Sequence, residues 1–93
     1  MDELLNDAAR RAQAYLKGLD NRAVAPSAEA LAALSELAGP WSEQGMDATE
    51  VLAKLDRLGG PATMASAGAR YFGFVTGGSL PVALAANWLS AAW

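Results

Sequence analysis

The stretch DELLNDAARRAQAYLKG, residues 2–18, decides the fold class. Its apolar residues recur at spacings of three and four, which places them on one face of a helix. Asp2 and Glu3 lie in the expected first turn, where the helix dipole favours anions, and Gly18 is a typical helix stop. The stretch therefore predicts an amphipathic helix. Its apolar stripe consists of Leu5, Ala8, Ala12, Tyr15, Leu16 and Leu19.

Three further helices are expected downstream. Residues 28–38 follow Ser27, a good N-cap, and stop before Pro40, which cannot continue the hydrogen-bond ladder. Residues 47–58 begin with Asp47 and carry Glu50 three positions later, a variant of the capping box. Residues 79–93 form the last expected helix, with Ser79 as its cap, and residues 62–67 allow one or two more helical turns. The pattern predicts an all-α chain of about four helices.

The composition supports this fold class and excludes several functions. The chain has 93 residues, enough for one small domain, and it contains no Ile and only four Val, so strand-forming residues are scarce. It has no His and no Cys, which excludes disulfides and zinc sites of the usual kind. The net charge of −3 argues against nucleic acid as a partner.

Charge divides the chain into two parts. Residues 1–57 carry every charged side chain except Arg70, and residues 71–93 carry none. We therefore distinguish amphipathic helices over 1–69 from an apolar part over 70–93, which comprises a loop and the start of a buried helix. An apolar part of this kind needs a covering. A membrane, a partner chain or more of the same chain are the candidates. The sequence stops at Trp93 without a cap or polar tail, which we interpret as a cut end.

A membrane is the weakest of these coverings. Gly73, Gly77, Gly78 and Pro81 interrupt the uncharged stretch, and the part that can form one helix is shorter than the roughly 20 residues that a span needs. The chain opens with Met-Asp-Glu, unlike a secretory signal. We therefore expect a cytoplasmic protein without a membrane partner.

Few residues suggest catalytic chemistry. Lys17 and Lys54 occupy polar helix positions, as surface lysines do, and the acidic residues lack the spacing of a calcium loop. Gly77-Gly78-Ser79 before a helix is either a weak anion site or a tight turn with a cap. We therefore predict no catalytic residue and no metal ligand in this chain.

The aromatic stretch Tyr71-Phe72-Gly73-Phe74 leaves two interpretations open. Rings next to glycine can form a wall against a ligand while the backbone approaches closely. The same rings can also fill the core of a small helical protein. Composition alone favours core packing.

The longer stretch RYFGFVTGGSLP, residues 70–81, with AANWL at 85–89 and AAW at 91–93, resembles the N-terminal region of group II pyridoxal-phosphate-dependent decarboxylases. These enzymes act on aromatic amino acids, glutamate, aspartate and similar substrates. The upstream pattern fits as well, through Tyr15, Leu19, Arg22, Val24 and Pro26, and then Gly45-Met46-Asp47.

The resemblance implies a place within a larger α/β aminotransferase-like enzyme of fold type I. In that family an N-terminal helical segment packs on the partner subunit of a homodimer. The lysine that binds pyridoxal phosphate lies downstream, so the parent enzyme would use the cofactor and this chain alone would bind none. Substrate contact is carried over to Thr76 first, then to Phe74 and Val75. The expected interface residues are Leu5, Tyr15, Leu16, Leu84, Trp88, Leu89 and Trp93.

The sequence thus predicts the N-terminal fragment of an amino-acid decarboxylase, which serves dimer assembly and one wall of the substrate pocket and is not catalytic alone. Its partners would be the rest of the enzyme chain, the second subunit and the amino-acid substrate. One alternative is a stand-alone helical module whose apolar C-terminal part binds another protein. Another is a peripheral membrane protein inserted through its last helix.

Overall fold

The computed structural model describes residues 1–74 and 79–93, and within them every regular element is helical, which confirms the all-α prediction. Four α-helices account for most of these described residues, and short 3₁₀ turns (η) follow the first three. The elements are α1 (Asp2–Lys17), η1 (Leu19–Asn21), α2 (Ala28–Ala33), η2 (Leu34–Ala38), α3 (Ala48–Gly59), η3 (Gly60–Ala62) and α4 (Pro81–Ala92).

Two helix starts follow the predicted capping chemistry. The Ser27 Oγ accepts a hydrogen bond from the Ala30 N–H at 3.1 Å. The Asp47 Oδ2 accepts one from the Thr49 N–H at 3.2 Å. Each cap satisfies a backbone donor that the first helical turn leaves free, so α2 and α3 begin where the sequence predicted.

Proline decides two helix boundaries: the helical residues before Pro40 end at Ala38, as predicted, whereas the start of the last helix differs from the prediction. Gly39, before Pro40, is already extended with ψ 170°, and the chain tightens from α-helix into the 3₁₀ turn η2 ahead of it. The predicted cap at Ser79 is wrong, because α4 starts at Pro81 and Leu80 is the N-cap. A residue before proline favours extended geometry, which Leu80 adopts with ψ 132°.

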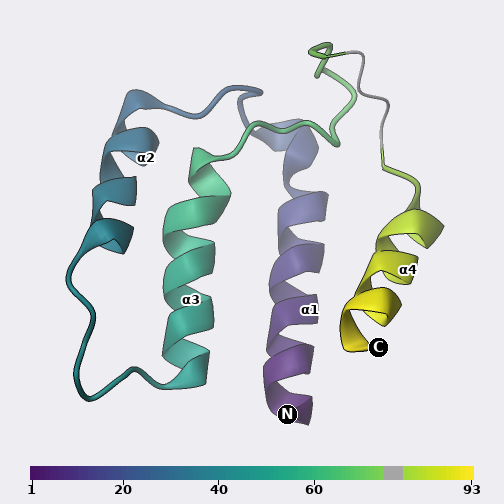
Figure 1. Cartoon of the computed structure of the whole chain (residues 1–93). Coiled ribbons are helices and arrows are strands. Elements are labelled where there is room, and N and C mark those ends of the chain that lie inside the picture. The colour runs from purple at the N-terminus through teal and green to yellow at the C-terminus, as the bar shows by residue number, and fades with distance from the viewer. Residues whose placement is uncertain (75–78) are drawn as a thin grey trace.

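The expected helical turns over residues 62–67 are also absent. The turn η3 ends at Ala62, and Thr63 is extended with φ −93° and ψ 154°. From there the chain crosses the end of α1 toward α4 (Figure 1). We call residues 63–70 the crossing segment, and they form no regular helix.

The helices stand in one row. Figure 1 shows α1 and α3 in the middle, α2 on the outer side of α3, and α4 on the opposite side of α1. The molecule measures 43 × 35 × 21 Å, and the shortest extent agrees with a single layer of helices. A single layer covers each helix on few sides, so much apolar surface stays open.

The core of the described residues is small and lies where the crossing segment meets the ends of α1 and α3. Leu19, Leu58 and Ala65 are its buried members. The Ala65 N–H donates to the Val24 carbonyl at 2.9 Å, and a Cβ at Gly68 would stand 3.2 Å from the Ala65 carbonyl oxygen. The crossing segment therefore packs closely against the residues that follow α1.

Candidate functional site

An apolar groove lies between α1 and α4 on the described surface. Its volume is about 670 Å³, and no charged side chain lines it. Alanines on α1 form one low wall, and larger side chains of α4 form the other. The groove is lined by Ala9, Ala12, Gln13, Leu16, Ser79, Leu80, Pro81, Leu84, Ala85, Trp88 and Leu89.

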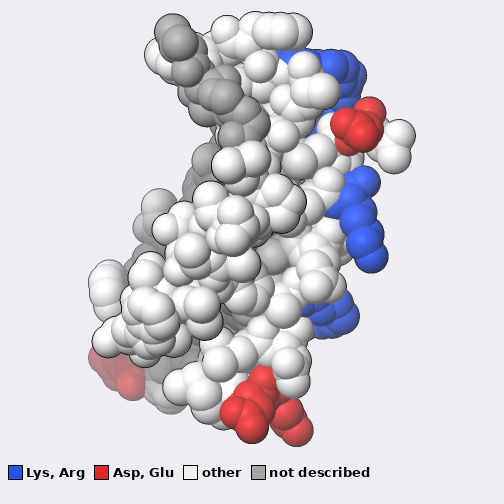
Figure 2. Space-filling model, turned by 90° about the vertical axis from the view of Figure 1, so that its right-hand side faces the viewer, with Lys and Arg blue, Asp and Glu red and all other residues white. Residues whose placement is uncertain are grey.

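The surface around the groove is equally uncharged. Figure 2 views the molecule from the α4 side and shows a broad white face, with acidic and basic side chains at its margins. Leu5 on α1 is 55% exposed, and Leu89 on α4 is 56% exposed. The sequence pattern of α4 is that of a buried helix, yet among the described residues its exposed leucine and tryptophan side chains remain open beside the α1 groove.

The structure brings most of the predicted interface residues to this face. Leu16, Leu84, Trp88 and Leu89 line the groove. The exposed Leu5 side chain belongs to the same helix as Leu16, and Trp93 follows α4 with 92% of its surface exposed. Six members of the predicted set thus belong to α1 or α4 themselves, and Trp93 adjoins α4.

Tyr15, the remaining member, is engaged within the chain. Its hydroxyl shares a hydrogen bond with the Thr63 Oγ1 at 2.9 Å, and the Arg22 guanidinium lies 5.0 Å from the centre of its ring. Tyr15 and Leu16 are consecutive, so their side chains leave the helix about 100° apart. The residues of the single predicted stripe on α1 therefore contact two different parts of the chain: Tyr15 contacts the crossing segment, and Leu16 lines the groove beside α4.

Arg22 has a structural role that the sequence did not reveal. Its guanidinium donates to the carbonyl oxygens of Gly60 at 3.2 Å, Pro61 at 3.4 Å and Thr63 at 2.9 Å. It borders a second hollow of about 530 Å³, whose other charged members are Arg11 and Asp56. Every residue has a backbone carbonyl, so the sequence could not indicate which carbonyls would accept hydrogen bonds from Arg22.

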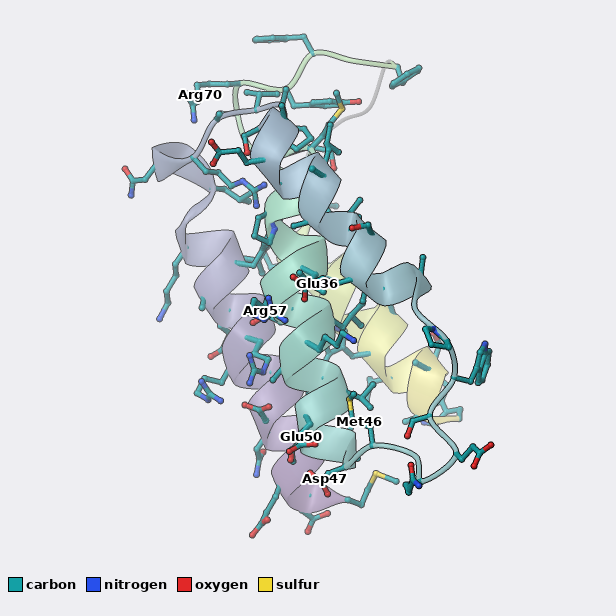
Figure 3. The ribbon with its side chains drawn as sticks, turned by 90° about the vertical axis from the view of Figure 1, so that its left-hand side faces the viewer. Glu36, Met46, Asp47, Glu50, Arg57 and Arg70 are labelled. Carbon is teal, nitrogen blue, oxygen red and sulfur yellow. The ribbon has the colours of Figure 1, made fainter. Side chains whose placement is uncertain are left out.

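Ion pairs join the helices on the polar side. Arg11 donates through Nε to the Asp7 Oδ2 at 2.9 Å and through Nη1 to the Asp56 Oδ2 at 2.9 Å. The hydrogen bond from Arg11 is the largest cause that lowers the pKa of Asp7 below 3.8, and it raises the pKa of Arg11 in return. Glu36 and Arg57 pair at 3.2 Å between η2 and α3 (Figure 3).

The carboxylate of Asp47 at the start of α3 is stabilised in the same way. The hydroxyl and the backbone N–H of Thr49 both donate to it, and these two hydrogen bonds lower the pKa of Asp47 below 3.8. Asp47 thus caps this helix, as predicted.

The aromatic stretch forms an exposed turn. Phe72 and Phe74 are each 90% exposed, so in this chain neither ring packs into a core. Phe74 has φ +56°, a conformation that few residues other than glycine adopt. The Tyr71 ring folds over Gly73 so closely that a Cβ there would stand 2.6 Å from the phenol oxygen.

Two of the predicted substrate contacts are not described. Val75 and Thr76 lie outside the described residues, as do Gly77 and Gly78 of the candidate anion site. Phe74 and Ser79 flank this interval. The prediction for Val75 and Thr76 therefore stays a prediction.

Searches among the described residues and among known proteins add three findings. Residues 1–74 and 79–93 contain no cluster of three His, Cys, Asp or Glu residues that could hold a metal ion. No helix of the described chain has the length and apolarity to cross a membrane. Comparison with protein-family models, curated proteins and solved structures finds no match.

Proposed function

We propose that the chain is the N-terminal helical segment of a pyridoxal-phosphate-dependent amino-acid decarboxylase of the cytoplasm, and that it serves assembly of a homodimer. In this proposal the aromatic turn forms part of the wall of the substrate pocket. One observation carries the assembly role: the uncharged α1–α4 face with its open groove. The sequence resemblance over residues 70–93 supports the enzyme family.

The chemistry of the face defines what can cover it. Contiguous apolar surface of this kind marks an interaction site in soluble proteins. Burying a charged group against it without a counter-ion is costly, so the covering surface has to be apolar as well. A groove between two helices suits a third helix laid along it.

A second copy of the chain supplies such a surface. The same face offers both a groove and exposed apolar side chains, because Leu89 is 56% exposed on the helix that forms one groove wall. A two-fold axis brings the same patch of both copies together, which is the commonest symmetry of homo-oligomers. Self-pairing of an uncharged face also avoids like-charge repulsion in a chain of net charge −3.

Pyridoxal phosphate is assigned to the parent enzyme, because the described residues do not fit it. The cofactor needs a lysine beside groups that hold its ring and phosphate. Lys17 is exposed on α1, and Lys54 lies on an open part of α3 with Glu50 and Arg57, of which Arg57 pairs with Glu36. We therefore derive no step of cofactor chemistry through these residues.

A stand-alone interaction module is the second candidate. The open α4 face favours it equally, since a different protein with an apolar surface can cover the same groove. The two proposals differ in self-association. The module needs a foreign partner, whereas the assembly segment pairs with its own copy.

Sedimentation velocity over a wide concentration range tests the assembly role. Wild type is expected to dimerise, and Leu89→Glu to weaken dimerisation at least 100-fold, because it places a charge on the uncharged face. The matched control is Leu37→Glu, which changes a leucine of similar exposure on η2, at the far side of the helix row. A wild-type monomer at all concentrations would reject the homodimer and favour the module.

A further inference from the structure

Arg70, the residue directly before the aromatic turn (residues 71–74), is hydrogen-bonded to a distant part of the chain. The Arg70 Nη2 donates to the carbonyl oxygen of Asp20 at 3.3 Å and also to that of Arg22. Arg70 is the only charged residue after position 57. Figure 3 shows it at the end of the molecule where the crossing segment runs. Its guanidinium group thus forms hydrogen bonds to backbone carbonyls about fifty residues earlier in the chain.

The carbonyl oxygens that accept hydrogen bonds from Arg70 belong to a part of the chain that has further contacts of its own. Asp20 lies in η1, next to the buried Leu19. Arg22 in turn donates to three carbonyls of residues 60–63 and stacks on Tyr15. Two guanidinium groups in series therefore connect the end of α1, the end of α3 and the start of the aromatic turn.

The turn itself is compact rather than extended. The Tyr71 N–H donates to the Gly68 carbonyl at 3.3 Å, and the Tyr71 ring lies over Gly73. Phe74 is left-handed. A left-handed residue other than glycine persists when its surroundings hold it. The Arg70 anchor supplies such a restraint at one end of the turn.

We infer that Arg70 is a positioning residue, which fixes the aromatic turn 71–74 and thereby the direction in which Phe72 and Phe74 project. A planar guanidinium can serve two carbonyls from one nitrogen while its stem stays in place, which a lysine ammonium does less well. An effect of Arg70 on substrate binding, through the position of the Phe74 ring, rests on the proposed function. The positioning itself rests on the contacts above.

Fluorine NMR offers a selective test, because the two Phe residues of the chain both lie in this turn. Protein labelled with 4-fluorophenylalanine gives one resonance for each ring. Arg70→Gln is expected to move both resonances to their positions in the urea-denatured chain, while circular dichroism keeps its helical signal. Arg57→Gln, which removes a surface charge elsewhere, is the control and should leave both resonances in place.

Three outcomes distinguish the possibilities. Unchanged resonances in Arg70→Gln would overturn the inference. Loss of helix in Arg70→Gln and in the milder Arg70→Lys would overturn it too, because Arg70 would then support the whole fold. If the resonances move but KM for amino-acid substrates in the complete protein does not, the inference holds and the substrate wall is rejected.

Discussion

Arg11 of α1 and Asp56 of α3 face each other across the two central helices, with Nη1 donating to Oδ2 at 2.9 Å. The same guanidinium also holds Asp7 through its Nε at 2.9 Å. One arginine therefore restrains its own helix and sets the register of the neighbouring one. None of the three side chains lines the α1–α4 groove.

The Arg11–Asp56 pair is expected to make a small, measurable contribution. Asp56→Asn should lower Tm by about 1–4 °C, because partly exposed pairs contribute little. Arg11→Met should lower it further, since Asp7 also loses its partner. The double variant should be less destabilised than the sum of the single variants, and strict additivity would show that the pair is not coupled.

Acid should destabilise the fold through Asp7 and Asp47, whose pKa values lie below 3.8 in the folded chain. A carboxyl group whose pKa is lower in the folded than in the unfolded chain stabilises the folded state at pH values above its unfolded pKa. This stabilisation is lost as the pH falls through the pKa of the folded state. Melting curves of wild type and Asp7→Asn should therefore differ at neutral pH and converge below pH 3.8. A constant difference across this range would contradict the assignment.

Removing the cap of α2 should weaken the fold. Ser27→Ala deletes the oxygen that accepts the Ala30 N–H, and loss of an N-cap costs about 1 kcal/mol. For a chain of this size that corresponds to a fall in Tm of about 4–8 °C. Ser35→Ala, at an exposed position of η2, is the control and should change Tm by less than about 2 °C.

The isolated chain should form no stoichiometric aldimine with pyridoxal phosphate. Neither Lys17 nor Lys54 has the desolvated surroundings that activate a lysine. Borohydride reduction followed by peptide mass spectrometry locates any adduct. In the proposed parent enzyme the adduct is expected outside residues 1–93, and a single modified site at Lys17 or Lys54 would refute the proposed division of roles.

If the proposed function holds, Phe74→Ala in the proposed parent enzyme should lower kcat/KM without changing Tm. The ring is 90% exposed in this chain, so its removal opens no cavity in the core around Leu58. The substrate wall predicts an effect on kinetics alone. A fall in Tm with unchanged kinetics would assign the ring to packing against the rest of the protein.

The sequence predicted the helices well where local chemistry decides them. The spacing of apolar residues and the caps at Ser27 and Asp47 are local signals, and the structure follows them. The start of α4 was misplaced because Pro81 forces extended geometry on the residue before it, which competes with the capping preference of Ser79.

The contacts between distant segments were beyond local reasoning. Arg22 and Arg70 bind backbone carbonyls, which carry no residue signature. The stripe on α1 gave the correct periodicity, but it could not show that Tyr15 turns to Thr63 while Leu16 turns to the groove. The predicted substrate contacts at Val75 and Thr76 remain predictions, because both residues lie outside the part of the chain that the structure describes.

The positions of the three tryptophans have a spectroscopic consequence. Trp41 and Trp93 are 98% and 92% exposed, Trp88 is 43% exposed, and the small core contains no indole ring. Melting of α1 and α3 should therefore change the emission wavelength little. Burial of Trp88 and Trp93 on the α4 side should shift emission to the blue, so intrinsic fluorescence follows association of this chain rather than its unfolding.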